Sequence, residues 1–301
     1  MLYKSRTKSN ELKILELLNN RMKLDNKDKQ HLLNLKKGYE GEVIFDSLTE
    51  QLQCECLILN DLLLEVNSTT FQIDSLFIVQ GRIYFYEVKN FEGDYYYESN
   101  KLYKKPKFEI VNPLDQLSRS ESLLRQLLFN LGFNLPIESL IVFINPNFTL
   151  YQAPLNKPIL FLGQVKRHLN NLNTTPSKLT IKHKKIAEQL FLLHKSDSPY
   201  KQIPPYNYEQ LRKGIICPKC QSLYQSVEKR KCICQYCGQA ESVVDAVLRN
   251  TKEFKLLFPN EKITTNKIHD WCQVVQSKER IRKVLKSNFK IVGVHQWSHY
   301  E

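Results

Sequence analysis

The residues of this chain whose types and spacing best fit a chemical role are two carboxylates, Asp74 and Glu87, which we expect to face each other across one β-hairpin. Directly opposed side chains lie roughly 4.5–5.5 Å apart at Cβ, and like charges there destabilise a sheet. A divalent cation would turn this repulsion into a binding site, because Mg²⁺ is held by one or two carboxylates with waters and substrate phosphate. Lys89 follows two residues after Glu87 and projects from the same sheet face. Two acids and a lysine at one point suit metal-assisted phosphodiester cleavage.

This arrangement depends on the elements that carry the two acids. Residues 71–79 and 82–89 are rich in β-branched and aromatic residues, so both segments are predicted to be strands. With Gln80-Gly81 as a two-residue turn, pairing that continues outward from the turn brings Asp74 opposite Glu87. Glutamine is unusual where φ must be positive, and a bulged turn would instead shift the register and put the acids on different faces.

Composition sets the class of protein. The chain has 301 residues, 42% of them hydrophobic, which is enough for two or three compact units with buried cores. No apolar run approaches the roughly 20 residues that cross a bilayer, and polar residues follow the amino terminus, so we expect a cytoplasmic protein with no membrane partner. The formal net charge of +13 favours polyanionic partners such as nucleic acid, although a lysine-rich genome bias would produce the same excess.

The pattern of apolar residues predicts an α/β fold of the α+β kind, with a mixed sheet and flanking helices. Asn112-Pro113 opens one helix, with asparagine as N-cap and proline at the first helical position. Residues 139–144 form a nearly continuous apolar strand of the type buried on both faces. Further helices are expected at 36–52, 164–171 and 177–194, and further strands at 54–59, 94–97 and 159–162.

Four short segments extend the pattern around the hairpin: Gly38-Tyr39-Glu40-Gly41-Glu42, Ile73-Asp74, Glu87-Val88-Lys89 and Asn112-Pro113-Leu114-Asp115-Gln116. Together they resemble the nuclease-related domain family, NERD, a branch of the restriction-endonuclease-like PD-(D/E)xK superfamily. The resemblance covers roughly residues 36–150, with the polar positions filled in order and on the expected elements. One position departs from the older superfamily signature, because Ile73 replaces the proline before the acid.

The resemblance implies a restriction-endonuclease-like core and a role for each polar position. Asp74 and Glu87 would hold Mg²⁺ or Mn²⁺, with the carbonyl of Val88 as a further ligand. Lys89 would orient or activate the attacking water and offset charge on the transition state. Glu42 would reach the metal site as a third acid.

Two further implications concern the helices. Gln116, one turn into its helix, would hold the water or a phosphate oxygen, and Gly38 and Gly41 would let the first helix approach the sheet closely. Taken singly, each residue also has a plainer interpretation. Glu42 fits a solvated helix acid, Gln116 a capping or surface residue, the glycines packing contacts, and Lys89 an ion-pair partner of the neighbouring acid.

Tyrosines and lysines follow the hairpin. Tyr95, Tyr96 and Tyr97 could stack on bases, and the lysines at positions 101, 104, 105 and 107 could track phosphates. A sheet-edge strand with a solvated basic turn is the favoured alternative, because tyrosines at period 2 are good strand formers.

Two C-x-x-C knuckles, Cys217-Pro218-Lys219-Cys220 and Cys234-Gln235-Tyr236-Cys237, are separated by 13 residues. Paired knuckles bring four thiolates to one structural Zn²⁺, and the segment resembles a zinc ribbon. Disulfides are the alternative, but five of the eight cysteines cluster here, which favours metal in a cytosolic chain. Cys232 competes with Cys234 as a ligand; we favour Cys234 because it gives the second knuckle its two-residue spacing.

Residues after the ribbon are predicted to be helical, at 246–258, 265–272 and 277–289. The last of these resembles the recognition helix of a helix-turn-helix, which enters the major groove of DNA. The alternative is a three-helix bundle that packs on the ribbon or on a partner protein. His295 and His299 fit surface or core positions. The basic residues that would contact nucleic acid are Lys278, Arg280, Arg282, Lys283 and Lys286.

The predicted organisation is an N-terminal helical extension (1–35), a nuclease-like domain (36–195), a linker (196–211), a zinc ribbon (212–240) and a helix-turn-helix-like segment (241–301). The predicted activity is Mg²⁺-dependent hydrolysis of DNA, in processing, repair or defence. RNA is the alternative substrate, and the protein could also form a homo-oligomer. One alternative is a non-catalytic nucleic-acid-binding or regulatory protein that retains the nuclease fold. Another is a scaffold whose ribbon and tail bind a protein.

Overall fold

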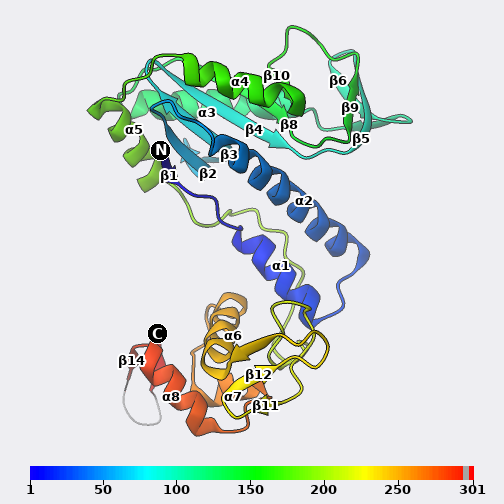
Figure 1. The fold of residues 1–301 in the computed structure, drawn as a ribbon, viewed down its shortest axis with the longest axis vertical. Coiled ribbons are helices and arrows are strands. Elements are labelled where there is room, and N and C mark those ends of the chain that lie inside the picture. Colours follow the sequence, from blue (N-terminus) through cyan, green and yellow to red (C-terminus); the bar gives the residue numbers. More distant parts are fainter. Residues whose placement is uncertain (294–297) are drawn as a thin grey trace. The chain divides into compact units, whose positions relative to one another are not determined.

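The computed structural model describes residues 1–293 and 298–301, so His295 lies outside the described residues. The chain divides into two compact units (Figure 1). One unit consists of residues 1–9 and 33–201, and the other of residues 10–32 and 202–301. The segment 1–35, treated above as one extension, is therefore shared between the two units. No described helix has both the length and the apolar character needed to span a membrane.

A six-stranded mixed sheet forms the centre of the first unit and consists, in sheet order, of β1 (Leu2–Lys4), β2 (Leu57–Val66), β3 (Thr69–Val79), β4 (Arg82–Lys89), β8 (Ile137–Phe143) and β10 (Ile159–Phe161). β3 pairs antiparallel with β2 and with β4, whereas β8 runs parallel to β4 and to β10. The mixed sheet expected from the sequence is confirmed.

Helices cover both faces of this sheet, with α3 (Pro113–Asn130) and α5 (Ile181–Leu192) on one face and α2 (Asn26–Thr49) and α4 (Leu162–Thr174) on the other (Figure 1). Alternate strand residues supply the two cores. Phe85 packs in the core with α3 and α5, whereas its neighbour Tyr86 packs in the core with α2 and α4. The result is a three-layer α/β arrangement, which confirms the predicted fold class.

Several elements differ from those expected, and three of them lie near the acids. α2 begins at Asn26 rather than near residue 36, β2 occupies Leu57–Val66 rather than 54–59, and β1 had no counterpart in the prediction. β1 is only three residues long and pairs in parallel with the distant β2, so no local periodicity marks it as a strand.

The β3–β4 hairpin has the predicted register, with Val79 opposite Arg82. Gly81 takes a φ of +86°, a conformation that glycine adopts without a steric penalty at Cβ. The backbone ladder between the two strands ends one position before Asp74 and Glu87 would pair. Both acids therefore lie at the open end of the hairpin, where side chains rather than backbone groups meet.

A second, four-stranded sheet belongs to the same unit and contains, in sheet order, β7 (Phe108–Ile110), β6 (Lys101–Lys104), β5 (Gly93–Glu98) and β9 (Phe148–Tyr151). β5 follows the end of β4 after a short connection, and β9 follows β8 in the same way. The predicted Tyr-rich strand is β5.

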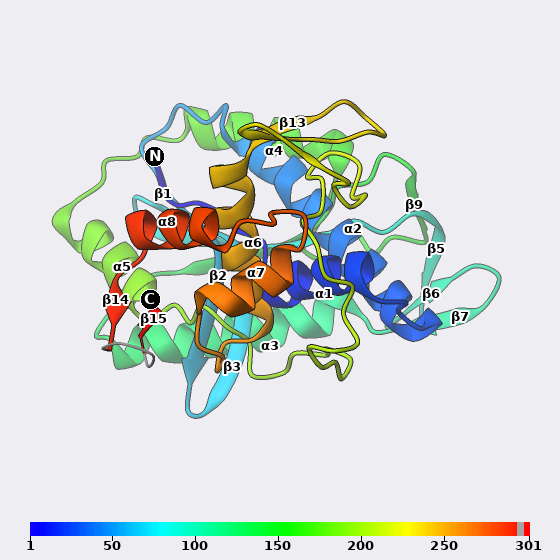
Figure 2. The same cartoon turned by 90° about the horizontal axis from the view of Figure 1, so that it is seen from below.

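The second unit combines helices with two small sheets (Figure 2). Its helices are α1 (Asn10–Arg21), α6 (Val243–Leu257), α7 (Thr265–Cys272) and α8 (Lys278–Asn288). One sheet consists of β11 (Val227–Glu228), β12 (Lys231–Ile233) and β13 (Ala240–Ser242), and the other of β14 (Ile291–Val292) and β15 (His299–Tyr300). The three predicted C-terminal helices are confirmed. Arg21 of α1 is fully buried against Glu253 of α6 and Trp271 of α7, so α1 is part of this core.

Candidate functional site

A buried carboxylate, a lysine and an amide meet at the end of β4. Glu87 is 2% exposed, and its Oε1 accepts hydrogen bonds from Lys89 Nζ at 2.7 Å and from Gln116 Nε2 at 2.6 Å. Lys89 Nζ also donates to Gln116 Oε1 at 3.1 Å. Asn112 is the N-cap of α3, as predicted, and its side chain accepts from the Leu114 amide, which fixes the first helical turn that carries Gln116. The structure thus brings together three of the residues singled out from the sequence.

Asp74 lies on the neighbouring strand β3 and is buried. The Val88 amide donates to Asp74 Oδ2 at 2.8 Å, so the aspartate side chain takes a backbone donor beyond the end of the ladder. This bond holds the Asp74 carboxylate beside the strand that carries Glu87. Asp74 is therefore close enough for its charge to disfavour ionisation of Glu87.

The pKa values of both acids are raised. Burial, and next the charge of Asp74, raise the pKa of Glu87 to about 7, and the Lys89 ammonium offsets only part of this effect. Burial also raises the pKa of Asp74, against the opposing influence of the Lys89 charge and the Val88 hydrogen bond. Without a cation, the pair therefore retains protons at pH values where isolated carboxyl groups are ionised.

One oxygen of this cluster indicates what the site would hold. Glu87 Oε2 is buried and has no hydrogen-bond partner among the described residues. A buried carboxylate oxygen without a partner costs free energy, which an ion or a water would recover. Carboxylate oxygens are the ligands that Mg²⁺ prefers. Glu87 and the adjacent Asp74 therefore fit a divalent cation.

Glu42, the expected third acid, pairs with Arg6. Arg6 is almost fully buried; it also donates to both carboxylate oxygens of Asp46, at 2.9 and 3.0 Å, and to the main-chain carbonyl of Asp74 at 2.7 Å. Burial and the charge of Asp74 raise the pKa of Glu42 to about 8. Within the described residues, no three acids are grouped closely enough to hold one metal ion. Glu42 therefore lies near Asp74, but its carboxylate forms an ion pair with Arg6.

Arg6 is the residue of this site that sequence reasoning missed. It follows the three-residue strand β1, and only the pairing of β1 with β2 brings it to the acids. A single arginine in a polar segment carries no motif, so the only signal was the net charge of the chain. Its contacts show that residues outside the NERD-like segment take part in the site.

The two glycines of α2 differ in what they do. A Cβ on Gly41 would lie 2.5 Å from Asn90 Cβ, so the close approach of α2 to the end of β4 requires glycine there. Asn90 donates to the Lys37 carbonyl at 2.7 Å and strengthens this contact. The prediction for Gly41 is confirmed. The prediction for Gly38 is wrong, because open space surrounds that position.

The four predicted ligands Cys217, Cys220, Cys234 and Cys237 gather with their sulfur atoms within 4.8 Å of one another. Two Sγ–Sγ distances are 3.7 Å, between Cys217 and Cys237, and 3.4 Å, between Cys220 and Cys234. Four sulfurs at ~2.3 Å from a tetrahedral Zn²⁺ lie roughly 3.8 Å apart, whereas a disulfide needs about 2.05 Å. The cluster therefore fits one structural zinc ion. Cys232 lies outside it, buried within β12.

The two knuckles have matching backbone geometry. The Gln221 amide donates to the Cys217 carbonyl, and the Gly238 amide donates to the Cys234 carbonyl. Gln221 and Gly238 both take positive φ, at 63° and 71°. A hydrogen bond from the Ser222 hydroxyl is the main cause that lowers the pKa of Cys234 to about 6, which favours the thiolate needed by a metal.

Zinc content provides a test of this ligand set. We expect the purified protein to contain zinc in a ratio of about one ion per chain. Cys234→Ser should lose most of it because a tetrahedral site lacks one thiolate, whereas Cys232→Ala should keep it. Atomic emission of desalted protein measures the ratio. Equal zinc loss from the two variants would contradict the assignment.

The basic residues of α8 divide into two groups. Lys278, Arg282, Lys283 and Lys286 are exposed. Arg280 is half-buried, and its guanidinium donates to the Lys229 carbonyl at 2.6 Å, so it joins α8 to the β11–β12 turn. Residues 273–277 connect α7 to α8. The prediction that the four exposed basic residues of α8 contact nucleic acid stays a prediction.

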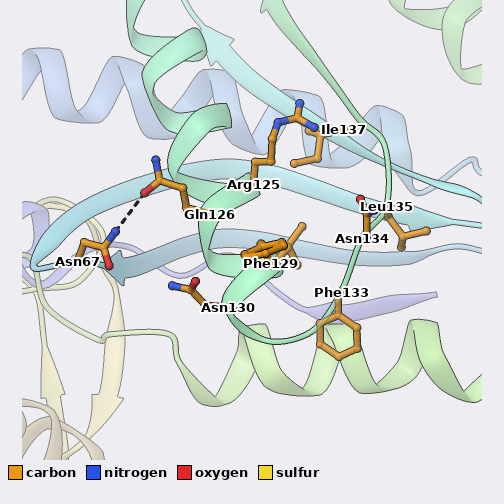
Figure 3. Close-up of a pocket in the computed structure, with 10 residues that line it drawn as sticks. Asn67, Arg125, Gln126, Phe129, Asn130, Phe133, Asn134, Leu135 and Ile137 are labelled. Atoms are coloured by element: carbon orange, nitrogen blue, oxygen red, sulfur yellow. Dashed lines mark hydrogen bonds between the residues drawn. The ribbon is translucent and has the colours of Figure 1, made fainter.

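A cavity of about 390 Å³ lies at the other end of α3, away from Gln116 (Figure 3). Amide, aromatic and aliphatic side chains line it together with Arg125, and among them Asn67 donates to Gln126 at 3.2 Å. Gln116 lies in the first turn of α3 and Phe129 in the last, so ~20 Å of helix separates the cavity from the acids. The cavity therefore does not belong to the carboxylate site.

Comparison with known proteins agrees with the polar cluster on β3, β4 and α3. The family model described as "Nuclease-related domain", NERD, matches residues 37–144, a segment that contains Asp74, Glu87, Lys89 and Gln116. No curated protein and no solved structure matches the chain.

Proposed function

Residues 37–144 of this chain are a nuclease-related domain, and from this premise we propose that the protein is a Mg²⁺-dependent nuclease that hydrolyses phosphodiester bonds of DNA. The observation that carries the proposal is the buried Glu87 carboxylate beside Asp74: its Oε1 accepts from Lys89 and Gln116, whereas its Oε2 has no partner among the described residues. A cation is the simplest group that would satisfy this oxygen and neutralise two adjacent acids.

Each residue would have a distinct task in the hydrolysis. Asp74 and Glu87 would hold Mg²⁺, which when bound supplies a Lewis acid for the phosphate and lowers the pKa of water. The ammonium of Lys89 would face the developing negative charge on the phosphate oxygens and stabilise it. Gln116, already hydrogen-bonded to both neighbours, would orient the attacking water through its amide. Arg6 would hold the Asp74 main chain in place.

The remaining features fit a polyanionic substrate. The net charge of +13 attracts phosphates, and the zinc cluster and the exposed lysines of α8 would add a second contact to DNA. Three finer points stay predictions. They are the choice of DNA over RNA as the substrate, the cytoplasmic location, and the pathway, which is processing, repair or defence.

One observation favours the alternative of a non-catalytic nucleic-acid-binding protein. Glu42 pairs with Arg6, so among the described residues Asp74 and Glu87 are the two acids that remain for the cation. Salt-sensitive DNA binding without any cleavage in Mg²⁺ or Mn²⁺ would support this alternative.

Substitution of the two polar neighbours of Glu87 tests the proposal. Wild-type protein should cut plasmid, linear duplex or single strands in Mg²⁺ and be inactive in EDTA. Lys89→Ala should lower the rate roughly 100-fold or more because transition-state charge loses its partner, and Gln116→Ala should lower it less. Lys184→Ala, on an exposed face of α5, is the matched control and should retain the wild-type rate. Cleavage that persists in EDTA, or a Lys89→Ala variant that cuts at the wild-type rate, would contradict the proposal.

A further inference from the structure

The open face of the four-stranded sheet carries a row of three tyrosines from three different strands. Tyr96 of β5 is the register partner of Tyr103 on β6 and of Tyr151 on β9. Residues directly opposite each other on paired strands point to the same face, so the three rings share one face. The rings of Tyr96 and Tyr103 stack, with centroids 5.0 Å apart and planes within 14° of parallel.

The other face of this sheet is the buried one. Tyr95 and Leu102 are 6% and 2% exposed, and Tyr95 packs on Phe91 and Phe148. Because successive residues alternate between faces, the tyrosine row must point away from this core. Tyr151 is 44% exposed, and Tyr96 and Tyr103, whose rings stack on each other, are half-buried, which agrees with an open face. The tyrosine run 95–97 is thus divided between the faces, and the row could not be read from consecutive residues.

Charge is distributed unevenly along this face. Lys105 lies above the Tyr151 ring, with Nζ 3.6 Å from the ring centroid, and Lys107 is exposed in the same turn. The acids of the face are Asp94, Glu98 and Glu109, and Lys101 pairs with Glu109 at 3.0 Å. The turn after β6 is therefore the basic end of the sheet.

The basic end is also the end nearest the carboxylate site along the chain. β5 begins at Gly93, four residues after Lys89, and an extended segment of that length spans at most ~14 Å. The Lys105 amide donates to the Asp94 carbonyl at 2.9 Å, so the lysine turn lies beside the start of β5. Figure 1 shows β5, β6 and β9 grouped beyond the ends of β4 and β8.

We propose that this tyrosine row is a stacking surface for unpaired bases of a single-stranded nucleic acid whose phosphates pass the lysine turn toward Asp74 and Glu87. The proposal rests on the proposed nuclease function and names its substrate class. Exposed aromatic side chains on a sheet bind bases by stacking, and nearby lysines neutralise the phosphates. Bases in a duplex are already stacked on one another, so single strands or unpaired ends are the form that this face accepts.

Binding experiments in EDTA, where no cleavage is expected, test the surface. Tyr96→Ala and Tyr103→Ala should each weaken binding of a single-stranded oligonucleotide roughly tenfold. Tyr96→Phe and Tyr103→Phe should bind as wild type, because the ring is kept. Tyr200→Ala removes a more exposed tyrosine of the same unit that lies off this sheet, and should have no effect.

An oligonucleotide of abasic nucleotides separates stacking from charge. The two alanine variants should bind it as wild type does, whereas Lys105→Ala and Lys107→Ala should bind it more weakly. Equal losses with the normal and abasic strands, failure of the phenylalanine variants to restore binding, or unchanged binding by both alanine variants would overturn the proposal.

Cleavage of the abasic strand in Mg²⁺ distinguishes this proposal from the proposed function. If the nuclease assignment holds, the alanine variants should cut the abasic strand at the wild-type rate and the normal strand, at low concentration, more slowly. Wild-type protein that cuts neither strand would contradict the nuclease function, while the binding results in EDTA would still decide the stacking surface.

Discussion

Glu87→Gln is expected to abolish metal-dependent cleavage and at the same time to make the metal-free protein more stable at pH 8. The amide retains the shape of the carboxylate and still accepts from Lys89, but it contributes no charge to a cation. We therefore expect the rate in Mg²⁺ to fall by roughly a thousandfold. Glu188→Gln changes an exposed acid of α5, and it should leave both properties unchanged.

The gain in stability follows from the direction of the pKa shift. The pKa of Glu87 rises from an ordinary 4.5 to about 7 in the folded protein. Between those values the folded state binds a proton that the unfolded state has released, so stability falls as pH rises through this window. Glu87→Gln has no carboxyl group to ionise at this position and avoids the loss.

Thermal unfolding followed by circular dichroism measures the effect. The Tm of Glu87→Gln minus that of wild type should grow from pH 5 to pH 8 in EDTA. Saturating Mg²⁺ should raise the Tm of wild type at pH 8 and leave the variant unchanged, because a ligand stabilises only the state that binds it. A variant with the pH dependence of wild type would contradict the electrostatic account of the site.

Arg21→Met is expected to destabilise the second unit by about 3–5 kcal/mol, the cost of leaving a buried charge without its partner. Arg21 is fully buried and donates to Glu253 at 2.6 Å and to the carbonyls of Arg212 and Gly214 at 2.6 and 3.1 Å. Its guanidinium also lies 4.0 Å from the ring centroid of Trp271. Methionine fills most of the volume but satisfies none of these groups.

Tryptophan fluorescence is a suitable probe, because Trp271 belongs to the second unit and its ring lies against the Arg21 guanidinium. The denaturation midpoint should fall strongly in Arg21→Met and recover in part when Glu253→Met is added, since no charge is then left unpaired. Arg125→Met removes an exposed arginine that pairs within α3, and it should change stability by less than about 1 kcal/mol. An unchanged midpoint in Arg21→Met would show that this buried network does not hold α1 in the unit.

Local signals in the sequence predicted the parts of the site that depend on neighbouring residues. The hairpin register followed from strand composition and Gly81, the start of α3 from Asn112-Pro113, and the zinc cluster from the spacing of its knuckles. The choice of Cys234 over Cys232 needed only the two-residue spacing. In each case the physical rule acts over a few residues of chain.

Long-range contacts could not be predicted in this way. Arg6 reaches Glu42 and Asp74 only because β1 pairs with β2, and Arg21 reaches Glu253 across most of the chain. Neither arginine lies in a motif, and a buried ion pair depends on a core that the sequence does not display. The tyrosine row could not be predicted for the same reason, because its three residues are aligned only by the register between paired strands.

A cleavage time course with wild type and Glu87→Gln, purified in parallel, tests the central claim most directly. End-labelled duplex and single-stranded DNA would be incubated with each protein in Mg²⁺ and in EDTA. The account predicts that products accumulate only with wild type in Mg²⁺. Equal product from both proteins, or no product from wild-type protein that binds the DNA, would contradict the claim that Asp74 and Glu87 form a metal-dependent phosphodiesterase site.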